Sequence, residues 1–275
     1  MSTTTDAAVR PTTTPVTRTS TRRALPAWAR VPAIWTISLV GGLLFWTYLS
    51  WWFGPSIIAS PAETVGALVE LAGNGTLAAS IGASSGRILV GWLTGVVIGA
   101  PIGILMGRLT FVRDLLDPYV EFFRFVPPIA FVTLTIVWFG IGELSKVALI
   151  FYTSVFMVVV STIQATVSIS PLRIQAAQNL GAGRWQLLRT IILPSTIPGI
   201  VTGARLAMGN SFLTIVSAEI VAANVGLGSL IWSARNYGRI DWIFAGILVL
   251  GTLGFVFDRV LRIVTNRLFH RYGVK

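Results

Sequence analysis

Side chains able to carry out chemistry are scarce in this sequence. The chain has no cysteine and a single histidine, His270, and its only lysines are Lys146 and Lys275. Disulfides, thiolate metal sites and cysteine nucleophiles are therefore excluded. A single histidine also does not suffice for histidine-based acid–base or metal chemistry. Neither lysine lies in a G-x4-G-K-[ST] phosphate loop, so ATP hydrolysis by this chain alone is not expected.

The remaining candidates are polar residues inside apolar segments. Arg205 and Glu219 lie in one such segment, with Asn210 between them. Charged groups at membrane depth are costly and usually face protein or water. A separation of fourteen residues puts Arg205 and Glu219 about 21 Å apart along a helix, too far to pair with each other. All three are candidate pathway residues, and a structural role, such as pairing with Arg87 or with backbone carbonyls, is an equal alternative.

The elements that position these residues are expected to be membrane-spanning helices. Hydrophobic residues make up 54% of the 275 residues and charged residues 11%, whereas a soluble domain has about 25% charged residues. A helix needs about 20 apolar residues to cross the hydrocarbon core. The sequence therefore predicts an all-α polytopic membrane protein, with a short extra helix over 61–71 outside the membrane. The six expected spans lie near 33–53, 85–107, 118–140, 145–167, 197–221 and 241–261.

The basic residues indicate how the chain is oriented. The net charge is +11, but the lysines and arginines lie at the ends of apolar runs and not on one polar face, so nucleic acid is not an expected partner. With the N-terminus inside, fifteen of the 21 basic residues fall on the inner side, which predicts that both termini are cytoplasmic. Residues 1–30, rich in Thr, Pro and Arg, are expected to form a disordered cytoplasmic tail, leaving 31–275 as the transmembrane domain.

A stripe of glycines marks the second expected span. One glycine recurs at every fourth position, which leaves one helix face bare and lets a neighbouring backbone approach closely. Helix packing within the subunit is the favoured interpretation, and a moving interface between subunits is the alternative. The stripe consists of Gly91, Gly95, Gly99, Gly103 and Gly107.

Two adjacent prolines interrupt the expected span at 118–140. Pro127 and Pro128 remove two backbone donors just after Glu121 and Arg124. Such backbone is tolerated in a membrane only where protein or a wet cavity receives it, and broken helices often flank translocation sites. An interfacial helix over 117–126, with Glu121 and Arg124 paired at i,i+3, followed by a short span, explains the sequence equally well.

The loop at 168–194, between two apolar segments, carries the most specific pattern. Pro171 is expected to begin a helix, and Gly181 and Gly183 permit a sharp turn after it. Trp185 is expected to start a second helix, which Leu193–Pro194 ends at re-entry to the membrane. The resulting small-residue face suits insertion into a groove on a partner, and a loop resting on lipid is equally plausible. Its candidate residues are Leu172, Gln175, Ala176, Ala177, Leu180, Gly181 and Gly183.

The spacing Q-A-A-x3-G-x9-I-x-L-P, from Gln175 to Pro194, resembles the E-A-A-x3-G-x9-I-x-L-P signature of inner-membrane permease subunits of bacterial ABC importers. Only Gln175 departs from it, and this side chain can hydrogen-bond but cannot form an ion pair. The resemblance covers about residues 35–270. Residues 58–61, 138–142 and 218–228 look like the nitrate, sulfonate and taurine branch.

The resemblance implies a type I ABC importer permease fold in a bacterial inner membrane, with the 168–194 loop coupling to a separate ATPase. The chain would be no enzyme and hold no cofactor, because ATP and Mg would be bound by the ATPase subunits. The other implied partners are an extracytoplasmic solute-binding protein and a second permease copy or paralogue. The solute would be small and anionic, such as a sulfonate, taurine or nitrate.

Two other function classes fit the sequence less well. A secondary transporter or channel working without an ATPase would need buried carboxylates for ion coupling, and Glu219 is the only plausible candidate in the sequence. An intramembrane enzyme would need nucleophiles or acid–base groups, but the expected spans contain no histidine or cysteine, no Ser–Lys pair and no two-aspartate motif.

Overall fold

The computed structural model describes residues 27–270, and all of the regular structure in this range is helical. The expected tail over 1–30 lies outside the described residues up to position 26, and the first helix already begins at Ala27. The described residues divide into two units within this helix, after Trp46. The helices are α1 (Ala27–Phe53), α2 (Pro61–Gly73), α3 (Thr76–Arg108), α4 (Thr110–Phe125), η1 (Pro128–Phe131), α5 (Val132–Phe139), α6 (Glu143–Val167), α7 (Pro171–Asn179), α8 (Arg184–Leu187), η2 (Leu188–Ile192), α9 (Leu193–Ala222), α10 (Leu227–Asn236) and α11 (Ile240–Phe269).

Five of the six predicted spans are confirmed as helices long and apolar enough to cross a membrane. Segments within α1, α3, α6 and α11, and the continuous helix formed by α8, η2 and α9, meet these requirements. The short helix expected over 61–71 is α2, whose first turn is closed by a capping box between Ser60 and Glu63. The apolar periodicity of the sequence was therefore sufficient to locate most of the helices.

The predicted span over 118–140 is not one straight helix. Helix α4 begins earlier, at Thr110, and ends at Phe125, and the following η1–α5 segment is bent from it by 96°. Pro127 and Pro128 cannot donate backbone hydrogen bonds, and a residue that precedes proline avoids helical geometry. Val126 accordingly has an extended backbone, with φ −75° and ψ 120°. If α4 and the η1–α5 segment together count as one bent span, they make the sixth crossing.

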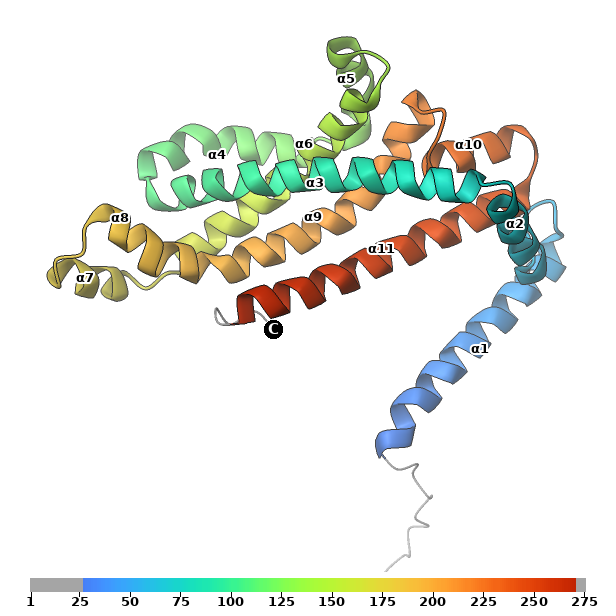
Figure 1. The fold of residues 1–275 in the computed structure, drawn as a ribbon, viewed down its shortest axis with the longest axis horizontal. Coiled ribbons are helices and arrows are strands. Elements are labelled where there is room, and N and C mark those ends of the chain that lie inside the picture. The colour runs from blue at the N-terminus through green and yellow to red at the C-terminus, as the bar shows by residue number, and fades with distance from the viewer. Residues whose placement is uncertain (1–26, 271–275) are drawn as a thin grey trace, which may run out of the picture. The chain divides into compact units, whose positions relative to one another are not determined.

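The second unit is centred on α6, which packs along both α3 and α9 (Figure 1). The glycine stripe of α3 is buried against α6: a Cβ on Gly95 would lie 2.5 Å from Ser154 Cβ, and one on Gly103 2.5 Å from Thr162 Cβ. Gly203 of α9 approaches Ser161 in the same way, at 2.7 Å. The bare glycine faces thus allow α6 to contact two neighbours at close range, as expected for small residues in membrane helix pairs.

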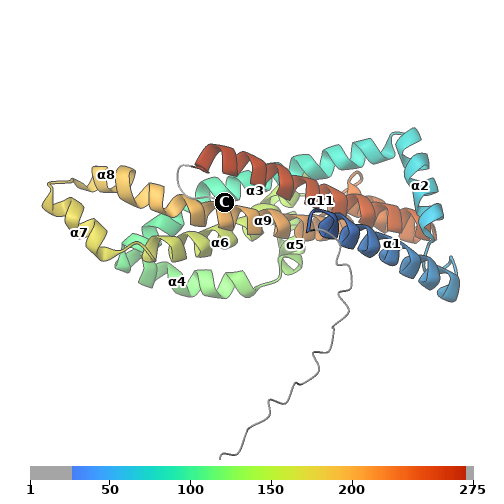
Figure 2. The same cartoon turned by 90° about the horizontal axis from the view of Figure 1, so that it is seen from below.

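Helices α7 and α8 lie at one end of α6 and α9, and α2 lies at the other end, as Figures 1 and 2 both show. The expectation that Leu193–Pro194 ends the second loop helix is wrong, since α8 continues through η2 into α9. The π-helical turn η2 shifts the hydrogen bonding, so that Leu193 N–H donates to Leu188 O, five residues back. This turn lets one continuous helix pass through Pro194.

Candidate functional site

Helix α7 ends in a left-handed glycine cap, which the A-A-x3-G spacing builds. Gly181 has φ +85°. Ala182 N–H donates to Ala177 O at 3.0 Å, and Gly181 N–H donates to Gln178 O at 2.9 Å. This is the Schellman pattern, and its usual apolar contact joins Ala177 and Ala182, which pack in the same cluster. The alanines and the glycine of the pattern therefore determine where α7 ends and how the chain turns.

One side of the segment from α7 to α8 (residues 171–187) is anchored in an apolar cluster. This cluster, called here the α7-end cluster, consists of Ile169, Ile174, Leu187 and Ile192, all at most 8% exposed. Ile104 of α3 and Ala177 pack against it. Because these contacts come from α3, from the loop after α6 and from α7, α8 and η2, the segment is held against the ends of the long helices.

The other side of the 171–187 segment is exposed. Leu172 and Leu180 are 74% and 89% exposed, and Gln175 and Ala176 are exposed between them. Gly181 and Gly183 are exposed at the turn, and a Cβ at either position would meet no atom within 4 Å. Two apolar side chains, an amide and small residues are thus presented on one face, and nothing within residues 27–270 covers them.

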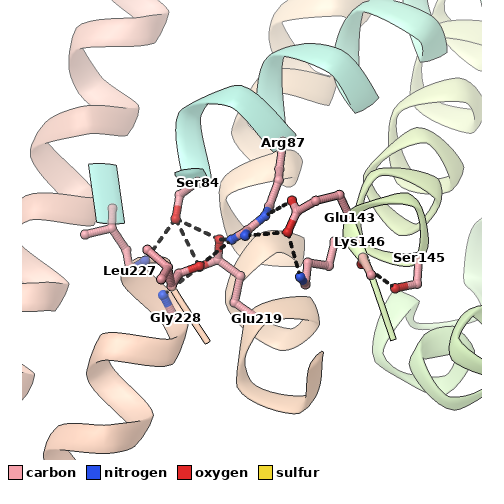
Figure 3. A network of polar contacts seen from close by, with 10 residues as sticks. Ser84, Arg87, Glu143, Ser145, Lys146, Glu219, Leu227 and Gly228 are labelled. Carbon is pink, nitrogen blue, oxygen red and sulfur yellow. Dashed lines mark hydrogen bonds and ion pairs between the residues drawn. The ribbon is translucent and has the colours of Figure 1, made fainter. Parts of the chain in front are cut away.

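Glu219 lies in a buried polar cluster at the other end of the molecule (Figure 3). Its carboxylate accepts hydrogen bonds from Arg87 Nη1 at 2.6 Å and from Ser84 Oγ at 2.8 Å. Arg87 Nη2 also donates to Glu143 Oε1 at 2.8 Å, and Lys146 Nζ donates to the same oxygen at 3.0 Å. We call these five residues the α2-end cluster. Its two cations and two carboxylates balance, so each charge has a partner.

The loop between α9 and α10 closes over Glu219. Gly228 N–H donates to Glu219 Oε2 at 2.8 Å, and Leu227 N–H donates to Ser84 Oγ at 2.9 Å. Gly226 has φ +149°, and a Cβ there would collide with the Glu219 carboxylate, so only glycine fits. Glu219 is 0% exposed. It joins α3, α9 and α10.

Arg205 is also paired. Its Nη2 and Nε donate to Asp258 Oδ1 of α11 at 3.0 and 3.2 Å. The sequence analysis did not single out Asp258, although an acid within the expected span at 241–261 was a visible signal. Which charge it pairs with could not be read from the sequence, because the two residues are 53 positions apart.

A cavity of about 720 Å³ opens between α6, α9 and the break after α4. Of the three predicted pathway residues, only Asn210 lines it; Arg205 and Glu219 lie elsewhere. The break itself forms part of the wall, with Arg124 and Pro128, and α6 contributes Tyr152 and Gln164. Tyr152 Oη donates a hydrogen bond to Phe123 O at 2.5 Å. Phe123 O lies four residues before Pro127, which has no N–H to donate to it. The broken backbone thus borders a cavity, as one of the two sequence interpretations required.

Comparison with known proteins places these features in a family. Residues 99–270 match the family described as binding-protein-dependent transport system inner membrane component. The taurine transport system permease protein TauC of Escherichia coli (strain K12) is 36% identical over 256 residues, covering 89% of this chain and 93% of TauC. The putative aliphatic sulfonates transport permease protein SsuC of Bacillus subtilis (strain 168) is 30% identical over 240 residues, covering 87% of this chain and 84% of SsuC.

The fold is similar to one found in a solved transporter. A chain in a structure of the MetNI methionine ABC transporter, in inward facing conformations, aligns with a TM-score of 0.57 at 22% identity. The alignment covers 69% of this chain and 96% of that chain. At this identity the likeness concerns the fold, and it shows that the arrangement of long helices described above occurs in an ABC transporter.

Proposed function

Since this chain belongs to the family of binding-protein-dependent transport system inner membrane components, we propose that it forms the pathway of an ABC importer for a small anionic solute. The 36% identity with the taurine permease TauC over 89% of the chain carries this proposal. Taurine and the aliphatic sulfonates of SsuC both contain a sulfonate group, which makes sulfonates the first solutes to examine.

Family membership confirms several expectations of the sequence analysis. The chain is a multi-pass inner-membrane component that translocates and does not catalyse a reaction. It holds no cofactor of its own, since ATP is bound by a partner ATPase, and a binding protein is the other partner of such a system.

The proposed site of coupling to the ATPase is the exposed face of the 171–187 segment. Leu172, Gln175, Ala176 and Leu180 offer a low apolar surface with one amide, which suits a groove on a partner. The buried side of the same segment contacts α3 through Ile104 and η2, which continues into α9, through the α7-end cluster. A force applied to the exposed face would therefore reach the long helices directly.

The proposed orientation puts this segment and both termini in the cytoplasm. The excess of lysine and arginine on that side supports it. In alternating access, ATP-driven closure of the ATPase pushes the 171–187 segments of two permease copies together and opens the pathway outward. A second copy or a paralogue is part of the proposal because the cavity in one chain is open on one side.

Purification of the tagged protein from its own membranes in mild detergent tests the function. We expect an ATPase and a solute-binding protein to accompany it, with ATP hydrolysis stimulated by the loaded binding protein. Ala176→Asp puts a charge on the exposed face of α7 and should release the ATPase. Gln178→Asp, also exposed but on the flank nearer Ile174, is the matched control and should retain it.

Two results would contradict the proposal. If Ala176→Asp left ATPase binding intact, the segment would rest on lipid and would not couple to the ATPase. If vesicles holding this chain alone took up taurine down an ion gradient without ATP, the protein would be a secondary transporter.

A further inference from the structure

The cavity beside the proline break contains a single formal charge in its wall. Of the residues that line it, only Arg124 is charged, and Asn210, Gln164 and Ser217 add uncharged polar groups. We propose that Arg124 makes this cavity selective for anionic solutes. The inference rests on the proposed function, because it takes the cavity to be part of the transport pathway.

Arg124 differs from Arg87 of α3 and Arg205 of α9. Arg87 contacts Glu219 at 2.6 Å and is 7% exposed, and Arg205 contacts Asp258 at 3.0 Å. For Arg124 the nearest carboxylate oxygen among the described residues is Glu121 Oε1, at 4.0 Å, and no hydrogen bond joins them. Arg87 and Arg205 are thus each held by an acid at hydrogen-bonding distance, whereas among the described residues Arg124 has only the looser 4.0 Å ion pair with the exposed Glu121.

The break after α4 limits the acids that Arg124 can reach within its own helix. It lies in the last turn of α4, two residues before Val126 leaves helical geometry, so no following helical turn can provide an acid at i+3 or i+4. Its guanidinium stacks over the Phe125 ring at 4.6 Å. Stacking positions the planar group through its face and leaves the N–H donors at its edge free for a ligand.

A lone arginine suits a sulfonate or carboxylate better than a neutral or cationic solute. Guanidinium groups present several N–H donors in a fixed fork and bind oxyanions through paired hydrogen bonds. The apolar part of the wall, which includes Phe123, Phe156 and Met157, lowers the local dielectric and strengthens the field of the charge. The cavity would therefore concentrate small anions with a short apolar part.

The absence of cysteine from the chain permits a direct test. Asn210→Cys places one thiol in the cavity wall of the purified transporter complex. Its modification by the anionic sulfonatoethyl methanethiosulfonate and by the cationic trimethylammonioethyl analogue is followed by the mass of this chain. The ratio of the two rates measures the electrostatic potential at the thiol, and the anionic reagent itself carries a sulfonate.

We expect Arg124→Gln to lower the anion-to-cation rate ratio at position 210 by about tenfold, the effect of one unit charge at several ångströms in a partly wet site. Arg124→Lys should keep the ratio within about twofold, because the charge remains. As a reference, Asn74→Cys lies at the exposed end of α2, and its ratio should not respond to Arg124→Gln.

Three results would overturn the inference. An unchanged ratio at position 210 would show that a carboxylate of a second copy neutralises Arg124. Absence of modification by either reagent would show that the cavity is closed to water. An equal fall at position 74 would show a general effect of the variant. Retention of the ATPase is measured on the same samples. A variant that no longer assembles with the ATPase is thereby distinguished from one that assembles but leaves the rate ratio unchanged.

Discussion

The two ends of the α3–α6–α9 core are held together by different interactions. At one end, the α2-end cluster joins three long helices through a neutral set of ion pairs in which Arg87, Lys146 and Glu219 are buried and Glu143 is exposed. At the other end, the apolar α7-end cluster holds α7 and α8 against Ile104 of α3 and against η2, which continues into α9. Directional contacts of charged groups hold one end, and non-directional apolar contacts hold the other.

This difference indicates where the molecule can change shape. A buried ion pair that loses one partner leaves an uncompensated charge, so small displacements are strongly resisted. An apolar cluster keeps most of its contact area when side chains slide by an ångström or two, because the hydrophobic effect is non-directional. We therefore expect rigid packing around Glu219 and adjustable packing beneath the 171–187 segment, the segment proposed to contact the ATPase.

The largest expected effect comes from breaking the ion pairs. Glu219→Leu leaves Arg87 buried beside Glu143 without its second acid and should cost about 3–5 kcal/mol of folding stability. The thermal unfolding midpoint in mild detergent measures it. Asp258→Asn, which breaks the partly exposed pair with Arg205, is the control and should cost less than about 1 kcal/mol. Similar losses in the two variants would contradict the proposed difference in burial.

A smaller loss is expected from the glycine stripe, which lies between the two ends. A Cβ on Gly103 would lie 2.9 Å from Val159 O as well as 2.5 Å from Thr162 Cβ. Gly103→Ala should therefore separate α3 from α6 and cost about 1–3 kcal/mol, as overpacking does. Gly209→Ala in α9 has no atom within 4 Å of the new Cβ and should be neutral or slightly stabilising in the same unfolding measurement.

At the α7 end, a backbone change should act locally. Gly181→Ala forces a left-handed conformation on alanine, at a cost of about 1–2 kcal/mol. Because an apolar cluster holds this end, we expect α7 to loosen while the rest of the molecule keeps its unfolding midpoint. Faster protease cleavage between α7 and α8 would show this, and Gly183→Ala, where φ is −71°, should not change the cleavage rate. A large drop of the global midpoint would mean that the cap supports the whole fold.

The smallest effect concerns an exposed ion pair near the α2 end. Hydrogen bonds from Arg239 and from Trp242 lower the pKa of Glu70. Because the folded pKa lies below the unfolded one, this contribution to stability is present above the unfolded pKa. It is lost as the pH falls through the folded value. The unfolding midpoint should decrease slightly more for the native protein than for Glu70→Gln between pH 6 and pH 3, and identical pH profiles would show that the contact contributes nothing.

The sequence predicted the long helices well because apolar length and periodicity are local properties. It also located the turn at Gly181, since a glycine cap depends on a few neighbouring residues. The bend between α4 and α5 was only one of two interpretations, because two prolines break a helix without determining the direction of the chain beyond it.

Pairing with Arg87 was named as an alternative for Glu219 and is confirmed, but the other long-range partners of the charged residues could not be predicted. Arg87 contacts acids 56 and 132 positions away, and Arg205 contacts one 53 positions away, so only the packing of α3, α6, α9 and α11 brings them together. The local pair of Arg124 with Glu121, part of one of two interpretations, is present at 4.0 Å, but the cavity that Arg124 lines is formed by three separate elements and could not be seen in the sequence.

The π-helical turn at Leu188–Ile192 has a mechanical consequence. Because it preserves the rod through Pro194, residues 184–222 form one continuous helix of 39 residues, about 58 Å long at 1.5 Å per residue. One end of this rod lies beneath the exposed face of α7, and the other carries Glu219, where the ion pairs act as a pivot. A tilt of about 5° around that pivot moves the far end by about 5 Å, a displacement comparable to one helical turn.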